Sequence, residues 1–212
     1  MPDPSLVRVP TRPDLIPFLR RTDVIDLDDP GILALASELE RGSASPLEAA
    51  GRAFEWVRDQ IDHSADAKRG PVTCRASDVL GHWTGFCYAK SHLLTALLRA
   101  MELPAGLCYQ RLRLDGAAGF CLHGLCAVLL PGVGWHRLDP RGNKPGVDAR
   151  FTPPVERLAF RTDLPGEADL PGVWPDPLPV VLAALTAHAE WEALLANLPD
   201  LAPPFPVVSA PG

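Results

Sequence analysis

The sequence lacks any run of basic residues and any apolar run long enough to cross a membrane. Its 26 acidic side chains outnumber its 20 basic ones, which gives a net charge of −6. Nucleic acids and anionic membranes attract clustered lysine and arginine, so we expect neither as a partner. Charged residues or prolines interrupt every apolar run before the ~18 residues that a spanning helix needs. The start of the chain also lacks the apolar segment of a secretory signal, so we expect a cytoplasmic protein.

The sequence is equally poor in motifs for metals and cofactors. Its five cysteines include no paired C-x-x-C spacing. Cys121, His123 and Cys126 come nearest to a zinc set, but strand alternation places Cys126 on the face away from the other two. No glycine-rich loop opens a helix as a phosphate-binding loop does. We therefore expect no metal and no cofactor, and an odd number of cysteines without an export signal favours free thiols.

Helix signals dominate the first half of the chain. Residues 29–42 are predicted to form a helix, because Asp29 can cap its start, Pro30 suits the first helical position and Gly42 follows its end. Residues 45–61 form a second helix, because Ser45 and the glutamate three residues later make a capping box. A helical turn or two is expected over 74–80. The third long helix runs from about 87 to 101, and leucines cover most of its circumference, which predicts a buried central position.

Short β-like runs follow the third helix. Residues 106–114, 121–130 and 135–139 are rich in strand-forming residues and are separated by glycine-containing turns. Residues 145–163 are expected to add another strand or two. A final amphipathic helix is predicted over 176–198, where an Asp-Pro pair marks its start.

This order of elements indicates an α+β fold. N-terminal helices come first, then a central helix that carries a cysteine and packs on an antiparallel sheet, then a C-terminal helix. We expect an N-terminal extension with one helix over 1–44, a core over 45–152, and a proline-rich C-terminal extension over 153–212. The extensions are expected to pack on the core as a single domain.

Cys87 stands at the start of the central helix, directly after Gly85 and Phe86. The free N–H groups of a helix's first turn favour a thiolate and can bind an oxyanion. Lys90, three residues further on, either supports the thiolate or extends along the helix to water. A single cysteine in an apolar helix is most often a core residue. The nucleophile hypothesis therefore depends on finding a base.

Six histidines compete for the role of base. His92 points to the opposite side of the helix from the cysteine, and two others lie in a polar loop and in the terminal helix. The choice narrows to His123 and His136, both on predicted strands. His82, in the loop before the central helix, remains an open alternative.

The hairpin that follows distinguishes these two strand histidines. If residues 130–132 form a three-residue loop, residue 129 pairs with 133. His123 then lies opposite Asp139 on one face, and the competing strand histidine falls on the other face. The hairpin therefore predicts a histidine with a carboxylate partner, which are the base and orienting acid that a thiol nucleophile needs.

These motifs resemble those of the transglutaminase-like superfamily, a branch of the papain-like cysteine enzymes. The matching stretches are TGFCYAKSHLLTALLRAMELPAG, HGLCAVLL and GVGWHRLDPRGN, within roughly residues 50–145. The resemblance implies that Cys87 is the nucleophile, His123 the base and Asp139 the orienting acid. It also implies a papain- or transglutaminase-like core.

The chain departs from the family pattern at two points. Gly124 and Leu125 follow the histidine, where family members usually have a small residue and an aromatic one. The aromatic residue that helps to form the oxyanion hole in true transglutaminases has only Trp83 and Trp56 as candidates, and neither is favoured. No acidic calcium-binding loop is present, so calcium dependence is not implied.

The resemblance implies amide-bond chemistry through a thioester intermediate. Hydrolysis of a peptide or protein amide, as by a protease or amidase, is the expected outcome. One alternative is transfer of the acyl group to an amine, as in a transglutaminase. Another is a non-catalytic interaction module that keeps the fold, although such a module has no need for all three catalytic groups.

Overall fold

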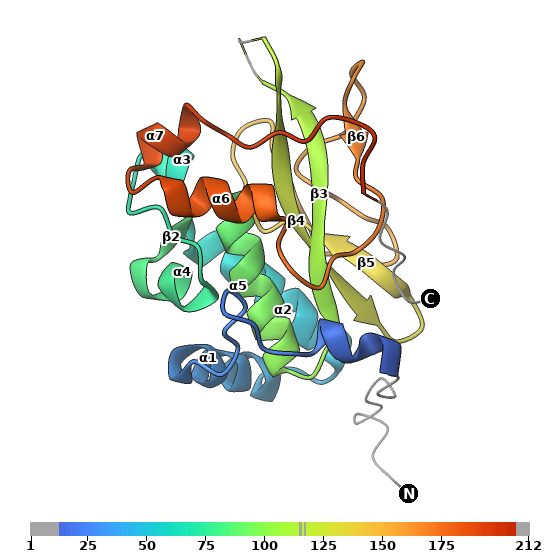
Figure 1. The fold of residues 1–212 in the computed structure, drawn as a ribbon. Helices are drawn as coiled ribbons and strands as arrows, with labels where there is room; N and C mark the ends of the chain where they lie inside the picture. Colours follow the sequence, from blue (N-terminus) through green and yellow to red (C-terminus); the bar gives the residue numbers. More distant parts are fainter. Residues whose placement is uncertain (1–12, 115, 117, 207–212) are drawn as a thin grey trace, which may run out of the picture.

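A computed structural model describes residues 13–114, 116 and 118–206 (Figure 1). Residues 1–12 and 207–212, which belong to the two predicted extensions, lie outside the described residues. The helices are a 3₁₀ helix (Pro13–Phe18), α1 (Pro30–Arg41), α2 (Pro46–Gln60), α3 (Ser64–Ala67), α4 (Ala76–His82), α5 (Cys87–Ala100), α6 (Pro179–Ala187) and α7 (Trp191–Leu195). The strands are β1 (Asp62–His63), β2 (Thr84–Gly85), β3 (Ala105–Arg113), β4 (Phe120–Leu130), β5 (Gly134–Leu138) and β6 (Ala168–Asp169).

Local capping determines where the two N-terminal helices begin. The Asp29 carboxylate accepts hydrogen bonds from the N–H groups of Gly31 at 2.8 Å and Ile32 at 3.3 Å. The Ser45 hydroxyl accepts one from the N–H of Glu48 at 3.2 Å. These side chains satisfy N–H groups that have no partner within the helix, so both predicted helix starts are confirmed.

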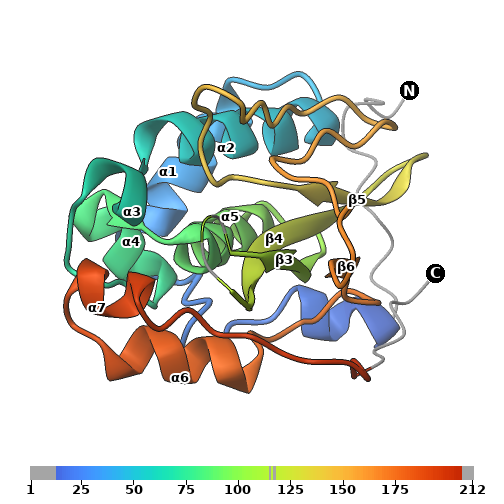
Figure 2. The same ribbon diagram turned by 90° about the horizontal axis from the view of Figure 1, so that it is seen from above.

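Helix α5 lies at the centre of the molecule, as predicted. Every residue from Cys87 to Arg99 is buried. Seen from above, α2 lies on one side of α5, α6 on the other, and the strands β3 and β4 beside it (Figure 2). Buried positions on all sides explain why leucines surround this helix rather than forming a single stripe. In the described part of the chain, no helix is both long and apolar enough to cross a membrane.

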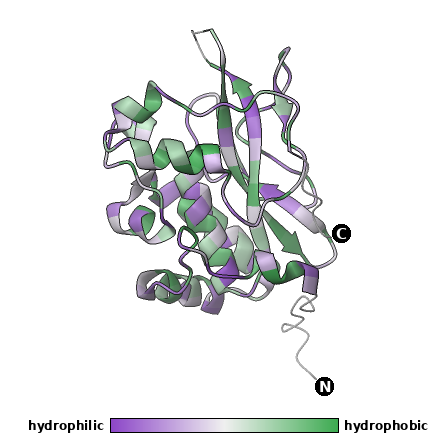
Figure 3. Ribbon diagram, viewed as in Figure 1, coloured by the Kyte–Doolittle hydropathy of each residue, from purple (hydrophilic) through white to green (hydrophobic). Residues whose placement is uncertain are grey.

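The main sheet has the strand order β5-β4-β3-β6, and its neighbouring strands are antiparallel. Cys126, Val128 and Leu130 of β4 share the apolar core with α5. Leu125 and Ala127 alternate with them and pack in a smaller cluster on the outer face. The largely apolar helix α6 (Figure 3) joins a third cluster beside the first turn of α5. Helices packed on an antiparallel sheet confirm the predicted α+β class.

The β4–β5 hairpin has a different register from the predicted one. Leu130 pairs with Gly134, so residues 131–133 form the loop and the predicted pairing of 129 with 133 is wrong. Gly132 has the expected left-handed φ of +73°, but Gly134 also has a positive φ, +92°, and β5 begins there. Each residue of β4 therefore pairs two positions further along β5 than predicted, and a shift of two leaves every side chain on its predicted face. His123 and Asp139 still share a face, as diagonal rather than direct neighbours.

Two further expectations about the second half of the chain are wrong. Residues 145–163 contain isolated bridges, Lys144 with Val147 and Arg150 with Arg157, instead of a strand. The helix predicted over 176–198 is divided into α6 and α7, because His188 adopts an extended conformation. The carbonyl of Ala189 in this gap accepts a hydrogen bond from the Val72 N–H at 3.0 Å. A tertiary backbone contact therefore interrupts a segment whose sequence alone favours a continuous helix.

Candidate active site

The chain enters α5 through a short parallel pairing of two strands. His63 of β1 pairs with Gly85 of β2, and Phe86 is the N-cap residue before Cys87. A side chain at Gly85 would meet Thr73 Oγ1 at 3.1 Å and the Ala89 methyl at 3.2 Å, so the turn into the helix is tightly packed. The Phe86 side chain makes no capping hydrogen bond. The first N–H groups of α5 are therefore not used by a capping side chain and point toward whatever lies beside Cys87.

Cys87 approaches β4 at a part of its edge that β5 leaves open. Leu138, the last residue of β5, pairs with Cys126, so residues 120–125 of β4 have no partner on β5. There the Gly124 N–H donates a hydrogen bond to Cys87 Sγ, with N and S 3.4 Å apart. The early end of β5 thus creates the place at which the helix start and the strand meet.

Gly124 allows this close approach because it has no side chain. A Cβ atom at this position would lie 2.9 Å from the Cα of Tyr88 and 3.1 Å from its backbone nitrogen. The Tyr88 hydroxyl, which is fully buried, donates a hydrogen bond to the carbonyl of Leu122 on the same strand. The first turn of α5 is therefore fixed to β4 on both sides of the candidate histidine.

His123 and Asp139 form the hydrogen bond that the sequence led us to expect. His123 Nε2 and Asp139 Oδ2 are 2.8 Å apart, and both side chains are buried. The carboxylate also accepts hydrogen bonds from the N–H groups of Arg141 at 3.2 Å and Ala159 at 2.9 Å. Burial acts to raise the pKa of Asp139, but the His123 charge and these hydrogen bonds lower it below its ordinary value. Asp139 is therefore an ionised, fixed acceptor.

The electrostatic environment of His123 favours the imidazolium. Burial opposes the charge, but the Asp139 carboxylate and the Cys87 sulfur outweigh it and raise the pKa of His123 to about 10. With Nε2 committed to Asp139, Nδ1 is the ring nitrogen left for the sulfur. The ring of Phe160 packs edge-on against the imidazole, with centroids 4.9 Å apart. The three candidate residues thus lie in the order sulfur, imidazole, carboxylate.

The alternative histidines do not join this group. His82 is exposed at the end of α4. His136 pairs with Val128 and faces the helices, where its ring packs edge-on against Phe151. It lies on the opposite face of the sheet from His123, as the alternation of strand side chains predicts.

Lys90 takes neither of the two roles considered for it. Its ammonium group is fully buried and donates hydrogen bonds to the carbonyls of Arg58 at 3.2 Å and Ile61 at 2.5 Å. These carbonyls belong to the end of α2, so Lys90 caps that helix from a neighbouring one. Burial lowers the pKa of Lys90 to about 7.

The structure also places Cys126 of the rejected zinc set and the two tryptophans considered for the oxyanion hole. Within residues 13–114, 116 and 118–206, no group of three or more His, Cys, Asp or Glu side chains is arranged to hold a metal ion. Cys126 lies on the α5 face and accepts a hydrogen bond from Thr95 at 3.4 Å. Trp83 and Trp56 pack against each other with ring centroids 5.7 Å apart, and Trp83 is 46% exposed.

Sequence reasoning missed His63, the histidine of the predicted polar loop after the second helix. Its side chain is only 9% exposed and lies beside the start of α5, where the ring packs edge-on against Phe86 with centroids 5.7 Å apart. Burial, followed by the charge of Arg141, lowers its pKa well below the ordinary value, so the ring is neutral. Arg141 itself forms a bidentate ion pair with Asp66, at 2.7 and 3.1 Å. No local signal marks His63, because its position depends on a strand pair formed by residues 22 apart in the sequence.

A family model described as "Transglutaminase-like superfamily" matches residues 33–140. This range contains Cys87, His123 and Asp139, and it makes up about half of the chain. Among curated proteins, none matches the chain.

Solved structures that match part of the chain come from several bacteria. A candidate cysteine protease from Cytophaga hutchinsonii is 20% identical, with a TM-score of 0.52 over 63% of this chain and 45% of that one. The periplasmic domain of TgpA from Pseudomonas aeruginosa is 23% identical, with a TM-score of 0.44 over 58% and 46%. A candidate protease from Parabacteroides distasonis is 13% identical, with a TM-score of 0.42 over 79% and 32%. The match spans less than half of each of these other chains.

Proposed function

The chain belongs to the transglutaminase-like superfamily, and from this membership we propose that it is a cysteine-dependent hydrolase of peptide or protein amides. Cys87 is the nucleophile, His123 the general acid and base, and Asp139 the residue that orients the imidazole. One observation supports this assignment most strongly. His123, which forms a buried pair with Asp139 at 2.8 Å, lies on the strand whose Gly124 N–H donates a hydrogen bond to Cys87 Sγ.

The proposed reaction begins with attack of the Cys87 thiolate on the amide carbonyl carbon. The carbonyl electron pair moves to the oxygen, and the Cys87 backbone N–H at the start of α5 stabilises the resulting oxyanion. When the C–N bond breaks, His123 gives its proton to the leaving amine, and a thioester remains. Water then attacks the thioester while His123 takes its proton. Cys87 departs as thiolate, and the carboxylic acid is released.

Asp139 contributes by holding His123 rather than by exchanging protons. Its three hydrogen-bond donors, from His123, Arg141 and Ala159, fix the carboxylate, and the carboxylate fixes Nε2 of the ring. The ring therefore presents Nδ1 to the sulfur and to the leaving nitrogen. This pairing also favours the protonated ring that the first step requires.

Alkylation of the intact protein tests the nucleophile. Iodoacetamide is expected to modify Cys87 at neutral pH faster than a model thiol, and His123→Ala is expected to slow that reaction at least tenfold. Cys74→Ala is the matched control, because burial raises the pKa of that thiol to about 11 and keeps it unreactive. A Cys87 that reacts no faster than the model thiol, in both the wild type and His123→Ala, would leave only the non-catalytic interaction module.

A second measurement separates hydrolysis from transfer. The protein is incubated with peptide amides and a labelled primary amine, with Cys87→Ala as the blank. Release of free acid, dependent on Cys87, supports the hydrolase. Incorporation of the amine at a rate that rivals hydrolysis would replace it with an acyltransferase.

A further inference from the structure

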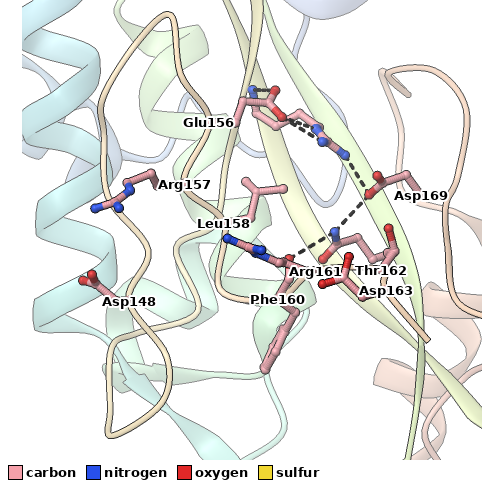
Figure 4. Close-up of a pocket in the computed structure, with 11 residues that line it drawn as sticks. Asp148, Glu156, Arg157, Leu158, Phe160, Arg161, Thr162, Asp163 and Asp169 are labelled. Carbon is pink, nitrogen blue, oxygen red and sulfur yellow. Dashed lines mark hydrogen bonds and ion pairs between the residues drawn. The ribbon is translucent and has the colours of Figure 1, made fainter.

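A cavity of about 460 Å³ lies on the outer face of the sheet, beside the candidate site (Figure 4). Its lining comes from the strands β3, β5 and β6, from the segment 156–163 and from Asp148. Figure 4 shows Phe160 at the lower edge of this cavity, with its ring directed away from the arginine side chains above it.

The cavity begins next to the candidate catalytic histidine. Gln110 of β3, which lines it, is paired with His123 of β4, so the two side chains share one face of the sheet as direct neighbours. Phe160 connects the same two residues. Its ring packs on His123, and its carbonyl oxygen accepts from Gln110 Nε2 at 3.5 Å. Phe160 therefore links the cavity lining to the His123 ring.

Gln110 presents an unsatisfied acceptor in this cavity. The residue is 2% exposed, and its Nε2 donates to Asp169 Oδ1 at 2.9 Å and to the Phe160 carbonyl. Both partners are acceptors, so the amide cannot be turned over, and Oε1 must be the atom that has no partner among the described residues. A buried carbonyl oxygen without a partner destabilises the fold, because it has lost its hydrogen bonds to water. This oxygen suits a ligand that supplies an N–H or O–H donor.

Two arginines in the cavity lining have no ion-pair partner among the described residues and could bind an anionic group. Arg137 forms ion pairs of 2.7 Å with both Glu156 and Asp169, so these two carboxylates are already partnered. Arg157 and Arg161 are exposed at the cavity, and neither forms an ion pair or side-chain hydrogen bond with any other described residue. Arg161 directly follows Phe160, the residue whose ring packs on His123. Asp163, the neighbouring carboxylate in the lining, also lacks an arginine partner in the described part of the chain and disfavours a second negative charge. The free groups thus suit one carboxylate near an N–H donor.

We propose that this cavity binds the amine-side half of the substrate and selects an amine that carries a carboxylate, as the C-terminal part of a peptide does. The proposal rests on the hydrolase function, in which His123 protonates the leaving nitrogen and therefore faces the amine side of the scissile bond. A backbone N–H of that half donates to Gln110 Oε1, and its carboxylate pairs with Arg161. The covalent steps are those given above, so the cavity adds binding and selectivity but no new chemistry.

Binding of the leaving half can be measured without turnover. Glycylglycine and glycylglycinamide are titrated into the Cys87→Ala protein and followed by NMR chemical shifts. Glycylglycine is expected to bind at least tenfold more tightly, and Arg161→Gln to remove most of that difference. Arg41→Gln, an exposed arginine on α1, is the matched control and should preserve it. Equal binding of the two dipeptides, or no binding of either, would overturn the proposal.

A parallel turnover assay keeps this test separate from the proposed function. Two substrates share one acyl half and end in either glycylglycine or glycylglycinamide. Hydrolysis of both with equal kcat/KM would refute the selectivity and leave the hydrolase intact. Absence of Cys87-dependent hydrolysis, together with an unreactive Cys87, would refute the hydrolase itself.

Discussion

The contact between Gly124 and the first turn of α5 offers a sharp test of how the site is built. In Gly124→Ala the new methyl carbon would lie 2.9 Å from Tyr88 Cα and 3.1 Å from Tyr88 N. Carbon atoms in good contact are about 3.5–4.0 Å apart, so β4 and α5 must separate by about 0.6 Å or more. The nearest atoms include backbone, so rotation of a side chain cannot relieve the contact.

This separation moves Cys87 away from the groups that serve it. The displacement first stretches the hydrogen bond between Gly124 N and Cys87 Sγ, which are 3.4 Å apart. Misplacement of reacting groups by about 1 Å can cost about 100-fold in rate, so we expect kcat/KM for amide hydrolysis to fall about 10- to 100-fold. Overpacking of this kind costs about 1–3 kcal/mol. For a chain of this length, that corresponds to a decrease in Tm of about 2–12 °C.

Rates of amide hydrolysis and of iodoacetamide alkylation, measured well below Tm, test this expectation. Gly81→Ala in α4 is the control, because its new Cβ would meet nothing within 4 Å. That variant should keep both rates and gain up to about 1 kcal/mol from the better helix former. If Gly124→Ala lowers Tm but leaves both rates at wild-type values, the close approach serves stability only and the argument about the site fails.

Three further predictions concern buried charges. Because burial lowers the pKa of Lys90 to about 7, the unfolded chain binds more protons there between pH 7 and 10, and this residue makes stability rise with pH. As pH rises from 7 to 9, the free energy of unfolding of Lys90→Met should fall behind that of wild type by up to about 2 kcal/mol in urea unfolding. Parallel pH curves for the two proteins would contradict this. Asp139→Asn removes a charge that helps to raise the pKa of His123 to about 10. The raised pKa stabilises the folded protein fully below pH 6.5, and this stabilisation is lost as pH rises through 10. We expect that variant to lose about 3 kcal/mol at pH 6 and about 10²–10⁴-fold in kcat, whereas activity within twofold of wild type would exclude the orienting role. Arg99 is 3% exposed and donates hydrogen bonds to three backbone carbonyls from separate segments. Arg99→Met should therefore lower the free energy of unfolding in urea by at least about 3 kcal/mol, whereas a loss below about 1 kcal/mol would show that water replaces these bonds.

The parts of the fold that were predicted correctly depend on neighbours in the sequence. Asp29 and Ser45 satisfy N–H groups two or three residues ahead of them, so their effect is visible in a short window. The central position of α5 follows from leucines on all its sides, and the order of helices and strands follows from the change of hydrophobic period after residue 105.

The errors arise where a distant contact decides the local structure. Nothing near His188 indicates that the chain must become extended there, because the Val72 N–H that bonds to Ala189 is more than a hundred residues away. His63 was assigned to a loop for the same reason, since its strand exists only by pairing with Gly85. Gln110 carries an alternating strand pattern like its neighbours, and its unsatisfied oxygen becomes visible only when Asp169 and Phe160 are in place.

The hairpin shows why the three candidate site residues were found despite a wrong register. The loop is 131–133 instead of 130–132, so each residue of β4 pairs with a residue of β5 two positions further along than predicted. A change of two preserves the face of every side chain, whereas a change of one would have turned Asp139 away from His123. The shift even improves the site, because β5 then ends opposite Cys126 and leaves the edge at Gly124 open to the sulfur.

The same geometry joins the C-terminal segment to the site. Ala159, in the segment assigned to a C-terminal extension, donates its N–H to Asp139, and Phe160 covers the His123 ring. A carboxylate this deeply buried stays ionised only because each of its oxygens has donors. Residues far beyond the Asp-Pro motif therefore help to keep the acid charged, the imidazole fixed and, through Gln110, the adjoining cavity polar. The sequence motifs specify which groups react, and the segment after them supplies the surroundings in which those groups can act.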